Sequence, residues 1–130
     1  MSRVCIVTNN PMVRDALSGK VDIDFREGSY LDVLVFVRDR IHEGSLLLTH
    51  PLSGSVKPGE TPYKSILLEL RQHGSVDTES LSIIENAIVV SRRLIEASRV
   101  DPGKLPQRVQ EDFQLIDRTL IESALPSAGL

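Results

Sequence analysis

The sequence has a single cysteine, no tryptophan and no long apolar run. One cysteine cannot form an intramolecular disulfide, which is typical of proteins in a reducing compartment. No apolar stretch approaches the roughly 20 residues that a membrane-spanning helix needs. The first residues also lack the pattern of a secretory signal. From these absences we expect a cytoplasmic protein with no membrane partner.

Neither sign of charge dominates, because 15 basic side chains are interspersed with 18 acidic ones, for a net charge of −3. Proteins that bind nucleic acid usually carry clustered basic residues. Aromatic side chains, on which bases stack, make up only 4% of the residues. We therefore expect no nucleic-acid partner. With 41% hydrophobic and 25% charged residues, the composition is that of a globular protein, and the length predicts one α/β domain over residues 1–130.

Two strand–helix units open the chain. Residues 3–8 form a short β-branched apolar run that predicts a buried strand, and Asn10 before a proline predicts the N-cap of a helix. Residues 21–25 alternate apolar and acidic side chains, which is typical of an edge strand with one exposed face. Ser29 then predicts the N-cap of a second helix, which we expect to end at Gly44.

The rest of the chain contains a long loop and more helices. Residues 46–48 predict a central strand, and residues 49–62 contain three prolines and two glycines, which exclude regular structure. Residues 64–70 fit either a fourth strand or a helix, and two helices follow. The order predicts a small three-layer α/β sandwich with a mainly parallel sheet of three to four strands and two C-terminal helices.

The loops that follow parallel strands meet at one edge of the sheet, where ligands of open α/β sheets bind. We expect an anion or carboxylate site there, with charge from Lys57, hydroxyl donors from serines and backbone N–H groups from Gly54. The alternative for the same residues is structural, with Asn10 and Ser29 as helix caps and Lys57 in solvent. The candidate ligand-binding residues are Thr8, Asn9, Asn10, Ser29, His50, Ser53, Gly54, Ser55 and Lys57.

Other sites are poorly supported by the sequence. Residues 54–61 are spaced like a phosphate-binding nucleotide loop, but Glu60 replaces the lysine that would bind the terminal phosphates. The three histidines have no metal-ligand spacing, so we expect no metal and no cofactor.

A small enzyme acting on a carboxylate or phosphate substrate is the alternative function, although the sequence offers no convincing nucleophile–base pair for it. A purely structural dimer, with the loop as its interface, is a third hypothesis.

The last helix carries an apolar stripe formed by Val109, Phe113, Ile116 and Leu120. Such a stripe usually packs on the core. Because a small sheet offers limited area to cover it, the stripe is also our candidate for a homodimer interface.

Three segments of the first half of the chain are distinctive: residues 6–11 (IVTNNP), 27–33 (EGSYLDV) and 48–65 (LTHPLSGSVKPGETPYKS). They resemble the GrdX family, small proteins associated with the glycine, sarcosine and betaine reductase systems of amino-acid-fermenting anaerobes. The resemblance implies an accessory protein with a glycine reductase component as its partner, and it implies no catalytic residue. Our leading hypothesis is therefore an accessory protein that binds a small anionic ligand or a partner through residues 49–62.

Overall fold

A computed structural model describes residues 3–54, 56–71 and 74–130. Two short 3-10 turns accompany the main helices, at Pro102–Lys104 and Pro126–Ala128. The helices and strands are, in chain order, β1 (Arg3–Thr8), α1 (Pro11–Leu17), β2 (Asp22–Phe25), α2 (Tyr30–His42), β3 (Leu46–Leu47), β4 (Ser65–Leu70), α3 (Thr78–Ala97) and α4 (Gln107–Ala124).

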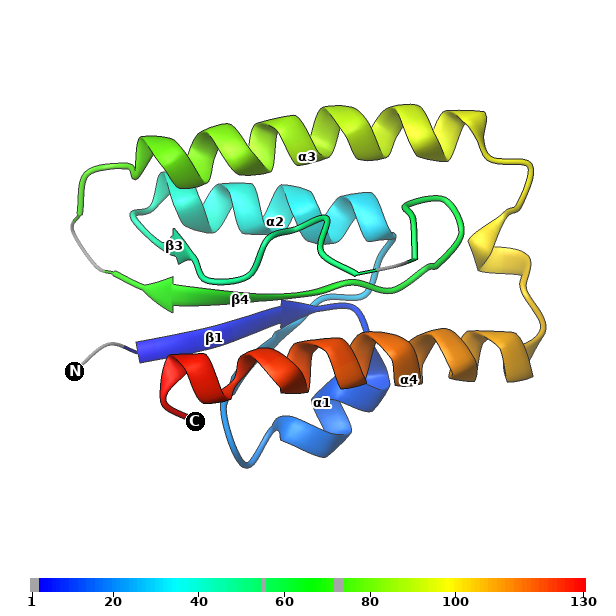
Figure 1. The fold of residues 1–130 in the computed structure, drawn as a ribbon, viewed down its shortest axis with the longest axis horizontal. Coiled ribbons are helices and arrows are strands. Elements are labelled where there is room, and N and C mark those ends of the chain that lie inside the picture. The colour runs from blue at the N-terminus through cyan, green and yellow to red at the C-terminus, as the bar shows by residue number, and fades with distance from the viewer. Residues whose placement is uncertain (1–2, 55, 72–73) are drawn as a thin grey trace.

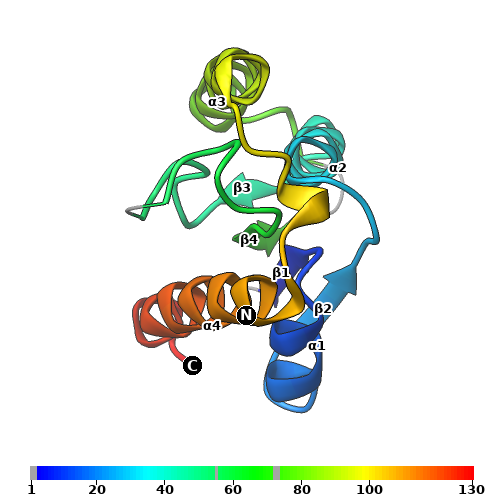
Figure 2. The ribbon, with the colours of Figure 1, turned by 90° about the vertical axis from the view of Figure 1, so that its right-hand side faces the viewer.

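The elements form three layers, with α2 and α3 on one face of the sheet and α1 and α4 on the other (Figures 1 and 2). Alternate side chains of the central strands supply the two cores. Val7 and Ile66 pack against α2 and α3, whereas Ile6 and Leu67 pack against α1 and α4. The predicted α/β class, the helices on both faces and the two C-terminal helices are confirmed.

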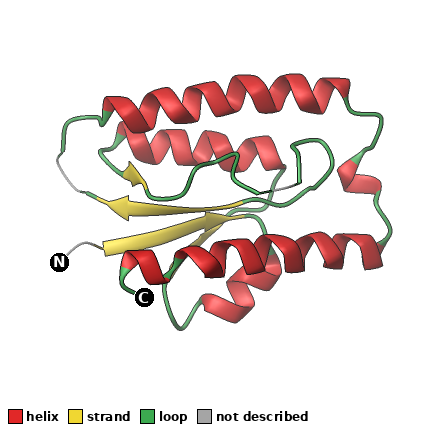
Figure 3. Cartoon of the chain, viewed as in Figure 1, coloured by secondary structure: helices red, strands yellow, loops and turns green. Residues whose placement is uncertain are grey.

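The sheet is mixed, so the prediction of a mainly parallel sheet is wrong. Its strand order is β2-β1-β4-β3, with β1 and β2 parallel and β4 antiparallel to both of its neighbours. A parallel neighbour requires a crossover connection, usually a helix. The described residues between β3 and β4 form no helix (Figure 3), so the chain turns back and β4 runs in the opposite direction.

The third strand is also not central. β3 has two residues and lies at one edge of the sheet, while β4 takes the central place beside β1. The first four residues of β4 are buried, which suits a position between two neighbours, whereas both residues of β3 are only half-buried. The edge position expected for the strand at residues 21–25 is confirmed, because β2 ends the sheet on the other side.

The helix caps follow the sequence signals. The Asn10 side chain accepts a hydrogen bond from the backbone N–H of Met12 at the start of α1. Ser29 and Asp32 form a capping box at the start of α2, which ends two residues before Gly44. Among the residues described, no helix is both long and apolar enough to cross a bilayer.

The direction of the strands brings several loops to one edge of the sheet. β1 and β2 end there, and β4 begins there because it is antiparallel to β1, whereas β3 lies toward the other end of β4, with Leu47 opposite Leu68. The long connection from β3 to β4 passes between α3 and α4 (Figure 2). This edge therefore collects the ends of β1 and β2, the start of β4 and the connection that leads into β4.

Candidate functional site

Asn9 joins three loops at this edge. Its Nδ2 donates hydrogen bonds to the backbone oxygens of Gly28 at 3.0 Å and Pro62 at 2.8 Å. Its Oδ1 accepts a hydrogen bond from the backbone N–H of Lys64 at 3.0 Å. The loops that follow β1 and β2 are thereby held against the residues that precede β4. Because this amide is buried and fully engaged, its role in the structure is to position the neighbouring residues.

Asp117 of α4 anchors that helix to the same edge. Its Oδ1 accepts the backbone N–H of Ser65 at 3.0 Å, and its Oδ2 accepts the Ser65 hydroxyl at 2.7 Å and Asn10 Nδ2 at 3.0 Å. The Thr8 and Ser65 hydroxyl oxygens lie 2.6 Å apart, and the backbone N–H of Asn10 donates to Thr8 Oγ1. Because the Ser65 hydroxyl donates to Asp117, the Thr8 hydroxyl donates to Ser65, and the three donors that reach the Asp117 carboxyl fit an ionised carboxylate.

The environment acts on the pKa of Asp117 in two directions. Burial raises the pKa of this carboxyl above its usual value, because a carboxylate loses hydration in the interior. The hydrogen bonds from Asn10 and Ser65 and the charge of Lys64 oppose that shift. Asp117 therefore presents a buried negative charge whose stabilisation depends on its donors.

Lys64 directly precedes β4 and is the buried cation of the site. The residue is only 5% exposed, and its Nζ donates a hydrogen bond to the backbone oxygen of Ser53 at 3.0 Å. Within the described residues no carboxylate forms an ion pair with this ammonium group. Burial lowers the pKa of Lys64, and the charge of Asp117 opposes the shift. A buried ammonium with a single neutral acceptor is energetically costly, so an anion would stabilise it.

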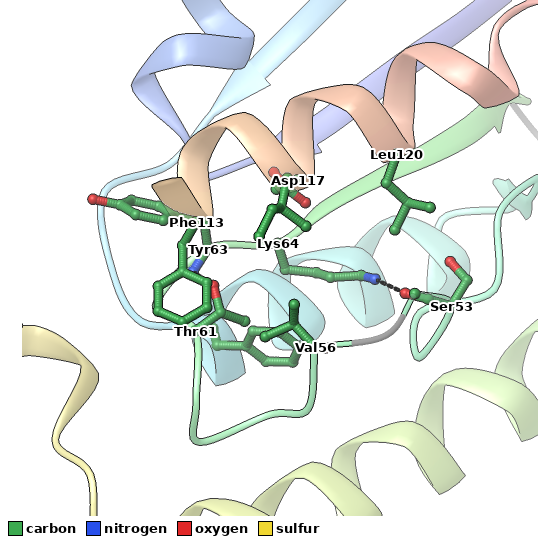
Figure 4. Close-up of a pocket in the computed structure, with 11 residues that line it drawn as sticks. Ser53, Val56, Thr61, Tyr63, Lys64, Phe113, Asp117 and Leu120 are labelled. Carbon is green, nitrogen blue, oxygen red and sulfur yellow. Dashed lines mark hydrogen bonds between the residues drawn. The ribbon is translucent and has the colours of Figure 1, made fainter. Parts of the chain in front are cut away.

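Lys64 and Asp117 both line a pocket between the long loop and α4 (Figure 4). The pocket has a volume of about 30 Å³. Since a water molecule needs roughly 10–15 Å³ by this measure, the space suits a small polar group rather than a nucleotide. Apart from the two charged side chains, the walls are mostly apolar and aromatic. The other lining residues are Tyr30, Ser53, Gly54, Val56, Thr61, Tyr63, Phe113, Ile116 and Leu120.

Five of the predicted site residues lie in the buried network at the end of β1 or at the pocket. Thr8, Asn9 and Asn10 lie together at the end of β1, where their side chains take part in the buried hydrogen bonds described above. Ser53 and Gly54 line the pocket, and Ser53 supplies the carbonyl that accepts from Lys64.

The remaining predicted residues lie outside this pocket. Ser29 is exposed and caps α2, and His50 is exposed with its Nδ1 accepting from the backbone N–H of Leu52. Lys57 is exposed and does not line the pocket. Ser55 lies outside the described residues. The structure therefore places two of the predicted residues at the pocket, three in the buried network at the end of β1, and the other described ones on the surface.

The two charged residues of the pocket are not among the residues predicted from the sequence. Lys64 stands directly before the apolar run of β4, and in a parallel sheet that position would lie at the opposite edge. The antiparallel direction of β4 brings it to the site. Asp117 interrupts the apolar pattern of the last helix next to Ile116, and an acidic residue on the buried side of a helix is a signal for a buried polar contact.

The stripe on α4 covers part of the pocket. Phe113 and Leu120 are half-buried and line it, whereas Ile116 remains 45% exposed. A homodimer through this stripe stays a prediction, and we expect light scattering at high micromolar concentration to show a dimer. A monomer under those conditions would contradict it.

The fold and the pocket define a class: a small three-layer α/β protein with two buried opposite charges beside a small cavity at one edge of its sheet. Among the described residues, no cluster of three potential metal-ligating side chains is present. A family model for GrdX-like proteins matches residues 5–126, and the chain belongs to this family. Neither the comparison with curated proteins nor that with solved structures gives a match.

Proposed function

We propose that this protein is an accessory protein of the glycine reductase type that binds a small anionic ligand in the pocket of Lys64. The GrdX-like family assignment supports the reductase association. The observation that carries the binding proposal is the buried Lys64 ammonium, which lines the pocket and has one neutral hydrogen-bond acceptor within the described residues.

The ammonium group has capacity for a ligand. A lysine ammonium has three N–H donors, and Lys64 uses one of them on Ser53. An anion in the pocket would accept from the others and supply the missing negative charge. The bond between the Lys64 ammonium and the loop also orients the cation before the ligand arrives, which reduces the entropy cost of binding.

Small anions test this proposal directly. We expect acetate or phosphate, titrated in chloride-free buffer and followed by NMR, to shift the amide signals of residues around the pocket. Replacement of Lys64 by methionine keeps a side chain of similar length without the charge, and we expect it to weaken binding about tenfold or more. Lys20→Met, at an exposed lysine, is the matched control and should leave binding unchanged.

Two further readouts separate this pocket from a site on the loop surface. If Lys57→Met rather than Lys64→Met abolishes binding, the ligand lies at the exposed loop and the pocket proposal fails. The affinity of the wild type should also fall as the pH rises through the lowered pKa of Lys64, below 10.5, because the neutral amine no longer attracts an anion. Affinity that stays constant to pH 10.5 would argue against Lys64 as the cation.

A further inference from the structure

We infer that the anionic ligand is a small phosphate monoester, whose phosphoryl group lies in a second cavity beside the Lys64 pocket and reaches the Lys64 ammonium with one oxygen. The inference rests on the proposed function, because it names the chemical class of the same ligand. The second cavity has a volume of about 240 Å³ and lies between the start of the long loop and the second half of α4. Since Ser53 and Leu120 line both cavities, the second cavity adjoins the Lys64 pocket.

The volumes indicate which part of a ligand each cavity can hold. At about 30 Å³, the Lys64 pocket has room for about two water-sized groups. It therefore admits one or two oxygen atoms of an anion, while the rest of the ligand requires the larger cavity. Figure 4 shows the Lys64 side chain extended toward Ser53, whose backbone oxygen accepts its hydrogen bond at 3.0 Å. The ammonium group thus lies on the side of its pocket that adjoins the second cavity.

The loop side of the second cavity carries hydrogen-bond donors that are not used within the described residues. Thr49, His50 and Ser53 line it, and the Ser53 hydroxyl has no hydrogen-bond partner among the described residues. The Nδ1 of His50 accepts from the backbone N–H of Leu52, so the neutral ring carries its proton on Nε2. The Thr49 hydroxyl accepts from the backbone N–H of Leu67 and keeps its own proton for donation. Three donors on this wall are therefore available to a ligand.

A phosphoryl group fits this set of donors better than a carboxylate does. Lys64 has two unused N–H groups, and Thr49, His50 and Ser53 offer one proton each. A carboxylate presents two oxygens in one plane, whereas a phosphate monoester presents three strong acceptor oxygens in a tetrahedral arrangement. Three oxygens can accept from the ammonium group on one side and from the loop donors on the other.

The charge distribution also favours the second cavity for the phosphoryl group. Within the described residues, no acidic side chain lines this cavity. Asp117 lines the Lys64 pocket instead, and its oxygens accept hydrogen bonds from Asn10 and Ser65. A group with nearly two negative charges therefore meets the Lys64 ammonium and neutral donors, with no carboxylate in the wall of the second cavity.

Three small anions test the chemical class on the unaltered protein. Methyl phosphate, malonate and acetate are titrated by NMR at about pH 8, where a phosphate monoester carries nearly two charges. Malonate matches that charge on two planar carboxylates. We expect methyl phosphate to bind about tenfold more tightly than acetate, and also more tightly than malonate.

The outcomes separate this inference from the proposed function. If acetate or malonate binds as tightly as methyl phosphate, the assignment to phosphate monoesters is wrong. The proposed function still stands in that case if Lys64→Met weakens the binding of these carboxylates. If none of the three anions binds and inorganic phosphate does not bind either, both proposals fail.

A variant of Ser53 tests the position of the phosphoryl group. Ser53→Ala removes the hydroxyl but keeps the backbone oxygen that accepts from Lys64, and we expect it to weaken methyl phosphate binding about fivefold. The matched control is Ser127→Ala, at an exposed serine outside the second cavity whose hydroxyl donates to the backbone oxygen of Ala124. This control should bind methyl phosphate like the wild type.

A variant of His50 gives a second readout of the same position. In His50→Asn the amide oxygen can replace Nδ1 as the acceptor for the Leu52 N–H, while the Nε2 donor is lost. We expect this variant to weaken methyl phosphate binding about fivefold as well, and His42→Asn, at an exposed histidine at the end of α2, to leave it unchanged. If both Ser53→Ala and His50→Asn bind methyl phosphate like the wild type, the phosphoryl group does not lie in the second cavity and the inference is wrong.

Discussion

Replacement of Asp117 by alanine is expected to lower the free energy of unfolding by about 3–5 kcal/mol. The carboxylate accepts three hydrogen bonds, from Asn10 and from two donors of Ser65, and all of these groups are buried. Without the carboxylate, the backbone N–H of Ser65 loses the acceptor it has in the structure, and each unsatisfied buried donor costs about 1–3 kcal/mol. The buried Lys64 ammonium also loses the nearby negative charge that favours it.

Urea unfolding followed by circular dichroism measures this effect. The matched control is Glu122→Ala on the same helix, whose carboxylate pairs with Arg118 where both side chains are more than one-third exposed. Such exposed pairs contribute less than about 1 kcal/mol, so the control should unfold close to the wild type. If Asp117→Ala is as stable as Glu122→Ala, the buried network does not hold α4 to the sheet.

The sequence was sufficient to predict the helices and most of the strands, because their signals are local. The capping residues Asn10 and Ser29 each stand directly before an apolar helical pattern, and the structure confirms both caps. The strand at residues 22–25 alternates acidic and apolar side chains, which correctly indicated an edge position. Signals of this kind depend on a few neighbouring residues and do not require knowledge of the sheet.

The order and direction of the strands were not local properties. A run of three leucines indicates a strand and residues 64–70 fit either a strand or a helix, but neither pattern states which segment lies at the centre of the sheet. The absence of a helix between them was the available evidence for an antiparallel pair. The same error concealed the role of Lys64, because its place at the functional edge depends on the direction of β4.

The ligand site at this edge stays a prediction, and the structure shows which of the predicted residues lie together there. The segment around Asn9 and the loop at residues 49–62 do meet, through the bonds of Asn9 to Gly28 and Pro62. Polar side chains in a loop can either contact a ligand or form hydrogen bonds to backbone groups, and the sequence does not distinguish these two roles. In the structure the side chains of Asn9 and Asn10 form hydrogen bonds to backbone and side-chain groups, whereas Lys64 is a buried cation without an ion pair among the described residues.

The second large effect is expected for Asn9→Ala, which should lower the free energy of unfolding by about 2–4 kcal/mol. The substitution removes three hydrogen bonds at once and leaves the Lys64 backbone N–H without its acceptor in a buried position. The matched control is Asn86→Ala, at an exposed position within α3, where alanine is the better helix former and no loss of stability is expected.

Hydrogen exchange shows whether Asn9 acts at the site or only on overall stability. In the wild type the Lys64 amide is buried and bonded to Asn9, so it should exchange slowly. In a folded Asn9→Ala variant we expect the Lys64 amide to lose protection while the amides at the centre of β4 keep theirs. We also expect weaker anion binding, because the Lys64 side chain is no longer fixed. Equal loss of protection along the whole of β4 would show that the variant destabilises the sheet globally, and unchanged exchange at Lys64 would show that Asn9 does not hold this residue in place.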